Sequence, residues 1–453
     1  MRDEFRILST TAILGYGFPM ASFEEGMKRS PHLIAVDAGS TDPGPYYLGA
    51  GVSFTDRSAV KRDLEIMIRA GVEKGIPVCI GSAGGSGGKP HLDWNREIIE
   101  EIAREQGLKF KLAVINAEVS KEIIKKAQAK GKVKPLDGAP ELSNELIDET
   151  TRIVAQMGVQ PFIKAFDNGA DVILAGRAYD PSVFAALPVA KGYDMGLATH
   201  LGKILECAAI CATPGSGADC MFGYIGDSYF RVEPLSESRR CTTVSVAAHT
   251  LYEKTDPYIL PGPGGYLDLT KTVFEQETPS IVKVSGSRFV SDSNPAVKLE
   301  GARKIGYRTV SIAGTRDPVM MNQIDEIITG VRERVADNYK DSNFEYYLNF
   351  TVYGRNGVMG ALEPLIDTWK SHEFGIVIEA VANSQELANT ICATARSTML
   401  HYGYEGRRAT AGNLAFPYSP SDFQAGEVYA FSVYHLMELS ESEDIFSIEY
   451  LEL

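Results

Sequence analysis

The strongest constraint on the fold is a regular alternation of short apolar runs and amphipathic segments through the first half of the chain. Between the runs, the segment 57–74 places Val60, Leu64, Met67 and Ile68 on one helical face. Such alternation is typical of a parallel sheet with helices on both faces. We therefore expect an α/β domain with a mostly parallel sheet. Its predicted strands are 7–14, 33–36, 76–80, 110–115 and 172–175.

The second half shows a different order of predicted elements. A strand at 308–313 is followed by a helix at 319–335, two strands, a helix at 385–401 and a last strand at 428–437. This βαββαβ order is that of a ferredoxin-like plait. We predict an α/β domain over residues 1–234 that binds a substrate or anion. An α+β domain over 235–453 would contain the plait.

Composition and charge exclude several classes of function. The net charge of -14 and the pI of about 5.1 argue against nucleic-acid binding, because a polyanion would be repelled. No segment approaches roughly 18 uncharged apolar residues, so we expect no membrane span. The six cysteines are scattered without a Cys-x-x-Cys pair. They indicate a reducing compartment, the cytoplasm, and buried structural thiols rather than metal ligands.

Polar loops after the predicted strands are the first places to look for function, because ligands bind beyond the carboxyl ends of parallel strands. The loop after the second strand starts at Asp37 and continues through Ser40, Thr41 and Asp42. Asp37 and Asp42 are candidate catalytic carboxylates, and the two hydroxyls are candidate substrate contacts. The alternative is a turn in which these side chains bond their own backbone.

The loop after the third strand is rich in glycine and leads into a helix. Its residues Ser82, Gly84, Gly85 and Ser86 suit an anion, since glycines let backbone N–H groups approach a phosphate or carboxylate. It matches neither a Walker motif nor a dinucleotide fingerprint in its usual place. A flexible surface loop is the alternative. His91 follows as a candidate acid or base, or as a structural histidine.

Two further loops complete the set of candidates. Glu118 follows the fourth strand, where catalysis and helix capping are equally good interpretations. Arg177 follows the fifth strand and offers a bidentate fork to a carboxylate or phosphate. Asp180 stands beside it, as a ligand contact or as a helix cap. All these loops should share one rim of the sheet.

At these loops the chain resembles the acyclic terpene utilisation A family. The resemblance implies a catabolic function in handling branched or terpenoid acyl groups, with coenzyme A as part of the substrate in the thioester case. It also implies a separate small partner subunit for chains that lack a further C-terminal domain. The motifs that carry the resemblance lie at 37–45, 81–85, 176–180, 353–360 and 412–417.

The residues together favour a lyase of the hydratase or dehydratase type, or an isomerase, that acts on a small carboxylate or acyl thioester. Arg177 and the glycine loop would hold the anionic group, and Asp37 or Asp42 would move a proton. A variant has Asp37, Asp42, Glu118 and Asp180 bind Mg²⁺ or Mn²⁺. Two alternatives stay open: a non-catalytic subunit of an acyl-processing complex, and a coenzyme A transferase. We expect a homo-oligomer.

Overall fold

The computed structural model describes residues 3–136, 138–368, 371–408, 411–439 and 445–453. They form two compact units, Met1–Arg303 with Phe431–Leu453, and Lys304–Ala430. Both units are mixed α/β in content. Two long strands, β15 (Ala296–Thr315) and β18 (Asp422–Glu438), each contribute residues to both units.

The first unit is built on a ten-stranded sheet in the order β12-β13-β9-β8-β1-β2-β3-β7-β4-β19. Its centre, β1-β2-β3-β7-β4, is parallel. The strands on either side of that centre are antiparallel. The strands are β1 (Phe5–Ser9), β2 (Leu33–Asp37), β3 (Val78–Gly81), β4 (Lys111–Ile115), β7 (Val172–Ala175), β8 (Met221–Ile225), β9 (Tyr229–Pro234), β12 (Val273–Gln276), β13 (Val282–Ser285) and β19 (Ile448–Glu452).

The sheet is therefore mixed rather than mostly parallel. The five predicted strands correspond to the parallel centre, while the flanking strands come from segments without a clear strand–helix alternation. Three of them, β12, β13 and β19, follow residue 234 in the chain but belong to the same sheet as β1. The compact units thus divide the chain at other residues than the expected 1–234 and 235–453.

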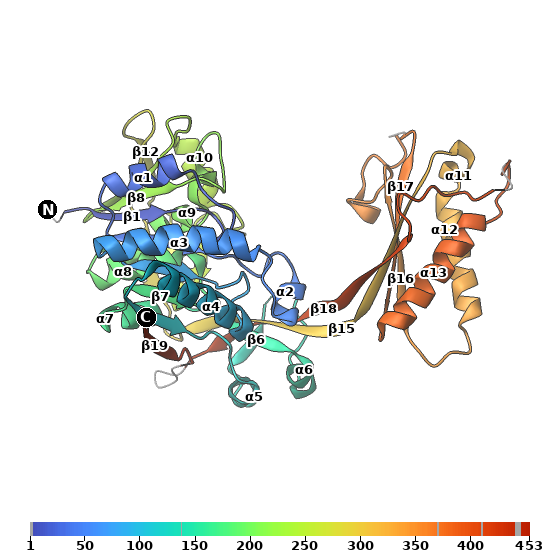
Figure 1. Ribbon diagram of the computed structural model, residues 1–453, viewed down its shortest axis with the longest axis horizontal. Helices are drawn as coiled ribbons and strands as arrows, with labels where there is room; N and C mark the ends of the chain where they lie inside the picture. The colour runs from blue at the N-terminus through green and yellow to red at the C-terminus, as the bar shows by residue number, and fades with distance from the viewer. Residues whose placement is uncertain (1–2, 137, 369–370, 409–410, 440–444) are drawn as a thin grey trace. The chain divides into compact units, whose positions relative to one another are not determined.

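Helices cover both faces of this sheet (Figure 1). Along β2 the side chains alternate: Leu33 and Ala35 join one core cluster, and Ile34 and Val36 join the other. Residues of α1, α3 and α4 fill the second cluster, and residues of α7, α8 and α9 fill the first. The bounds are α1 (Met20–Lys28), α2 (Pro45–Ala50), α3 (Arg57–Lys74), α4 (Lys89–Gln106), α5 (Lys121–Ala129), α6 (Asn144–Glu149), α7 (Val159–Asp167), α8 (Asp180–Ala190), α9 (Met195–Leu205) and α10 (Thr243–Thr250).

Helix α9 differs from the others because it is buried on every side from Gly196 to Leu205. It contains the buried polar side chains Thr199, His200 and Lys203. Asp194 caps its start by accepting a hydrogen bond from the N–H of Leu197 at 2.9 Å. Charged groups on such a helix must find partners inside the protein.

Smaller strands complete the first unit. Three of them form the separate sheet β10-β11-β14, and the other two pair with the long strands, β5 with β18 and β6 with β15. Their bounds are β5 (Val133–Pro135), β6 (Arg152–Ala155), β10 (Ile259–Gly262), β11 (Gly265–Asp268) and β14 (Arg288–Ser291). Among the described residues, no helix is long and apolar enough to cross a membrane.

The second unit contains an antiparallel part of a sheet in the order β16-β17-β15-β18. Every second residue of β17, from Phe374 to Ala382, is buried. Those from Phe374 to Ala380 pack against α12 and α13 in one core cluster. Its elements follow β15 in the order α11 (Pro318–Asn322), α12 (Ile324–Asn338), β16 (Tyr346–Tyr353), β17 (Phe374–Ala382) and α13 (Gln385–His401), before β18.

Candidate active site

The loops after β2, β3 and β7 are joined to one another by backbone hydrogen bonds. The N–H of Ala38 donates to Gly81 O at 2.8 Å, and the N–H of Ser82 donates to Gly176 O at 3.1 Å. The N–H of Arg177 donates to Gly87 O at 3.2 Å. The parallel strands thus bring residues more than a hundred positions apart to one edge of the sheet, as the sequence predicts.

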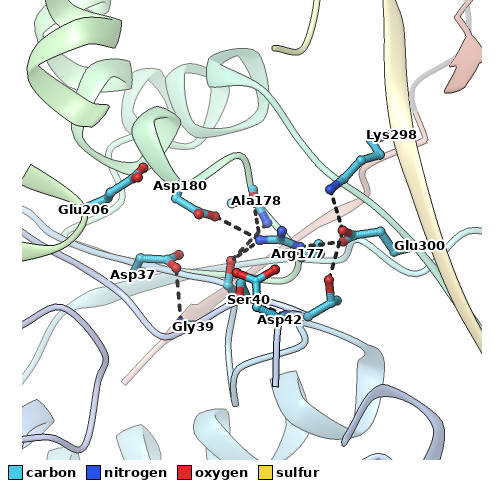
Figure 2. A network of polar contacts seen from close by, with 12 residues as sticks. Asp37, Gly39, Ser40, Asp42, Arg177, Ala178, Asp180, Glu206, Lys298 and Glu300 are labelled. Atoms are coloured by element: carbon cyan, nitrogen blue, oxygen red, sulfur yellow. Dashed lines mark hydrogen bonds and ion pairs between the residues drawn. The ribbon is translucent and has the colours of Figure 1, made fainter. Parts of the chain in front are cut away.

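Arg177 is the centre of the polar network at this edge (Figure 2). It is only 3% exposed. Its Nε donates to Glu300 Oε2 at 2.7 Å, and one terminal nitrogen donates to Asp180 Oδ1 at 2.9 Å and to Ala178 O at 2.8 Å. The same nitrogen reaches Ser82 Oγ at 3.3 Å. Much of the fork expected to hold a substrate is therefore bonded to the protein itself.

Glu300, on β15, holds Arg177 in place. Its second oxygen, Oε1, accepts hydrogen bonds from Thr41 Oγ1 at 3.0 Å and Lys298 Nζ at 2.7 Å. Burial alone would raise the pKa of this carboxyl, but Arg177 and Lys298 outweigh that effect and lower it to about 2. Glu300 was not among the sequence candidates, because it lies inside a strand far along the chain rather than at a strand end.

Asp37, at the end of β2, is buried and bonded on one side only. Its Oδ2 accepts from the N–H of Gly39 at 3.2 Å. Its Oδ1 has no hydrogen-bond partner among the described residues. Burial and the nearby Asp180 carboxylate raise the pKa of Asp37 well above its ordinary value, against the opposing charge of Arg177. A Cβ at Gly81 would stand 2.8 Å from Oδ1, so glycine there leaves room for this carboxyl.

A second buried acid, Glu206, lies just after α9 and forms an ion pair with Lys203. Figure 2 shows Asp37, Asp180 and Glu206 on the same side of Arg177. Burial raises the pKa of Glu206 to about 7, although Lys203 opposes this shift. Its Oε2 has no hydrogen-bond partner in the described part of the chain. Sequence reasoning missed both residues. The available signal was a lysine and a glutamate three positions apart at the end of a largely apolar segment.

The glycine loop is packed inside the protein and does not form an open surface loop. Residues 81–88 are all buried. The N–H groups of Ser82, Ala83, Gly85 and Gly87 donate to carbonyls of the protein. Gly84 lies against His91, and the hydroxyl of the buried Ser86 has no partner among the described residues. Four of the amides expected to cradle an anion thus already have partners in the protein.

Glu118 and His91, two candidates for catalysis, make hydrogen-bond contacts with the protein backbone. Glu118 Oε2 accepts from the N–H of Lys89, the first residue of α4, at 2.9 Å. It therefore caps a helix other than the one that follows it in the chain. His91 Nε2 lies 3.1 Å from both Tyr47 O and Val52 O, and burial lowers the pKa of His91 to about 4. No hydrogen bond or ion pair joins either residue to Asp37 or Arg177 among the described residues.

The remaining candidates lie in the turn after β2. Thr41 is buried and bonded to Glu300, as described above. Ser40 Oγ accepts from the N–H of Asp42 at 3.1 Å, which is the local turn bond considered as an alternative. Asp42 itself is exposed. It lies at a pocket of about 460 Å³ that is also lined by Thr41, Lys298, Glu300 and Tyr434.

The four carboxylates considered as metal ligands are not gathered around one point. Asp180 is paired with Arg177, Glu118 caps α4 and Asp42 is exposed. Within the described residues, no group of three or more His, Cys, Asp or Glu side chains is arranged to hold a metal ion. The six cysteines are free thiols, and all but Cys207 are buried.

Residues 56–220 and 230–422 match the model of the acyclic terpene utilisation family protein AtuA. The match covers well over half of the chain. The chain belongs to this family. The part matched to the AtuA family contains the glycine loop, Arg177, Asp180, Glu206 and Glu300, whereas Asp37 lies before it. The comparisons with curated proteins and with solved structures gave no match.

Proposed function

We propose that the protein is an enzyme of acyclic terpene utilisation that moves protons on a small acyl substrate, as a hydro-lyase or an isomerase. The observation that carries this proposal is the pair of buried, partly unpartnered carboxyls: Asp37 near the fixed Arg177, and Glu206 beside Lys203. Enzymes that use acid–base chemistry near neutral pH need carboxyls whose pKa values are raised and differ from each other.

In a hydration, Glu206 would accept a proton from water as the water oxygen bonds to the β-carbon of an unsaturated acyl group. Asp37 would give its proton to the α-carbon, and the electrons of the double bond would form that new C–H bond. In an isomerisation, one carboxyl would take a proton from carbon and the other would return one at a second carbon. Arg177, held by Glu300, would fix the geometry and the field around Asp37.

We also propose that the second unit has a ferredoxin-like arrangement. It is supported by the order of elements from β15 to β18 and by the strand order β16-β17-β15-β18. No step of the proposed chemistry depends on it.

Incorporation of deuterium into substrate carbon tests the proposal even though the natural substrate is not known. The purified chain is incubated in D₂O with a panel of branched enoic and hydroxy acids and their thioesters, and NMR follows deuterium at carbon. We expect exchange with the wild type and a loss of roughly 10²–10⁴-fold in Asp37→Asn and Glu206→Gln. Asp292→Asn removes an exposed carboxylate of the same unit and should leave the rate unchanged.

Equal exchange rates in the wild type and in both site variants would overturn the proposal. If the wild type catalyses no exchange with any acid or thioester, the result also counts against an enzyme and favours a binding subunit. Circular dichroism of each variant checks that the fold is retained.

A further inference from the structure

The cationic side chains near Asp180 differ in whether they have an ion-pair partner. Arg177 is paired with Glu300 and Asp180, Lys298 is paired with Glu300, and Lys203 is paired with Glu206. Each of these cations therefore has a carboxylate of the protein within ion-pairing distance. These pairs use three carboxylates, and Asp37 is held toward its neutral form.

Lys254 is the exception among the cations of this cluster. It is half-buried in the turn after α10, and its Nζ lies 5.9 Å from the centre of the Tyr179 ring. Within the described part of the chain, its ammonium has neither an ion pair nor a hydrogen bond. Burial and the charge of Lys203 lower its pKa, while Glu206 and Asp180 act in the opposite direction. Lys254 and Glu206 thus influence each other's pKa, and Asp180 and Lys203 influence the pKa of both. The neighbouring Glu253 is exposed and bonded to Tyr252.

We propose that Lys254 binds the carboxylate of the substrate, so that the protein acts on a free branched acid rather than on its coenzyme A thioester. This inference rests on the proposed function and names the substrate class for that site. A half-buried cation that has no ion-pair partner is stabilised by a bound anion, and a free acid supplies a full negative charge. A thioester carbonyl is neutral and would leave Lys254 without an ion-pair partner.

The glycine loop supplies an independent reason to favour the free acid. Coenzyme A would bring a pyrophosphate, and the strand–loop–helix segment at 81–91 is where the sequence offers a place for it. Four N–H groups of that loop donate to carbonyls of the protein. The N-terminus of a helix binds anions in many proteins. At the start of α4, that position is already occupied by the carboxylate of Glu118.

The orphaned oxygens of the two acids fit the same arrangement. Glu206 is 5% exposed and Asp37 is 4% exposed, so unpartnered oxygens on both are costly without a bound group. A carboxylate on Lys254 would lie near the ring of Tyr179. The cation, the two acids and the aromatic ring of Tyr179 come from different segments of the first unit.

Equilibrium binding to the full chain tests this inference with three probes: an acyclic methyl-branched enoic acid, its primary amide and its coenzyme A thioester. We expect the wild type to bind the acid at least tenfold more tightly than the amide or the thioester. Lys254→Met should weaken acid binding about tenfold or more, and Lys254→Arg should restore part of it. Lys271→Met removes an exposed lysine of the same unit and should leave binding unchanged.

Two results would overturn the inference. One is that the thioester binds as tightly as the acid or more tightly. The other is that acid binding is absent in the wild type or unchanged in Lys254→Met. Neither depends on turnover, so a failure here is separate from a failure of the proton-transfer proposal. Thermal unfolding of Lys254→Met and Lys254→Arg shows whether a loss of binding is a loss of fold.

Discussion

At the scale of single residues, two buried carboxyls of the site have pKa values shifted in opposite directions. Glu300 is buried between Arg177 and Lys298, and the two cations hold its charged form. Asp37 is equally buried but lies beside Asp180, and its neutral form is favoured. The difference comes from the partners, because desolvation acts on both carboxyls in the same direction.

The raised pKa of Asp37 predicts a stability cost that grows with pH. A carboxyl whose pKa is higher in the folded state favours folding most below its unfolded value of about 3.9, and this contribution is lost as the pH rises. Asp37→Asn removes the titration. We expect its free energy of unfolding in urea to exceed that of the wild type by about 1 kcal/mol or more at pH 7, with the difference shrinking toward pH 4. A difference that is constant with pH would contradict the assigned environment.

The sequence could predict the position of residues at strand ends but not of groups elsewhere. Asp37, Ser82 and Arg177 were predicted to lie at one edge because parallel strands place their carboxyl ends there. Glu300 and Lys254 come from a remote strand and a turn, and no local pattern links them to that edge. For Glu118, the local pattern could not show that its oxygen would cap a different helix. The strand-end rule predicts where a site lies better than it predicts every group in it.

At the scale of elements, the site depends on close packing between the loops after β3 and β7. A Cβ at Gly87 would lie 2.1 Å from the backbone N of Arg177. Gly87 also has φ of +67°, which non-glycine residues rarely adopt. The glycine-rich composition of this loop was predicted to serve a ligand. In the structure, it lets two segments of backbone approach closely enough to position Arg177.

We expect Gly87→Ala to lower the free energy of unfolding by about 2–4 kcal/mol. It should also reduce the rate at which the protein catalyses deuterium exchange into the substrate. Gly131→Ala is a matched control, because Gly131 has φ of +69° but nothing within 4 Å of an added Cβ. It should cost only the backbone strain, about 1–2 kcal/mol. Urea unfolding of both variants measures the difference. Equal losses would mean that the contact with Arg177 carries no energy.

At the scale of the whole molecule, the chain forms two units, each with a core of its own. The sequence pointed to a change of character in the second half, and the predicted strands and helices there correspond to β15 through β18. It could not show the division between the units, because β15 and β18 each run across it as continuous strands. Periodicity detects a strand but not the core to which each part belongs.

Because each unit has its own core, a cavity in the second unit should destabilise that unit and leave the first unit unchanged. Ile378 is fully buried in β17, and Ile378→Ala should destabilise its unit by about 2–5 kcal/mol. Native-state hydrogen exchange should then show lost protection in β16 and β17, with β2 and β3 unchanged. Equal loss of protection in β2 and β3 would show that the two units unfold as one.

The central claim is that Asp37 is a carboxyl held toward its protonated form at the edge of the sheet, ready to exchange a proton with a substrate. Infrared difference spectroscopy at neutral pH measures this directly through the C=O stretch of protonated carboxyl groups. We predict a protonated carboxyl band in the wild type and in Asp292→Asn that loses intensity in Asp37→Asn, with the contribution of Glu206 remaining. The same protonated-carboxyl signal in the wild type and in Asp37→Asn would contradict the account.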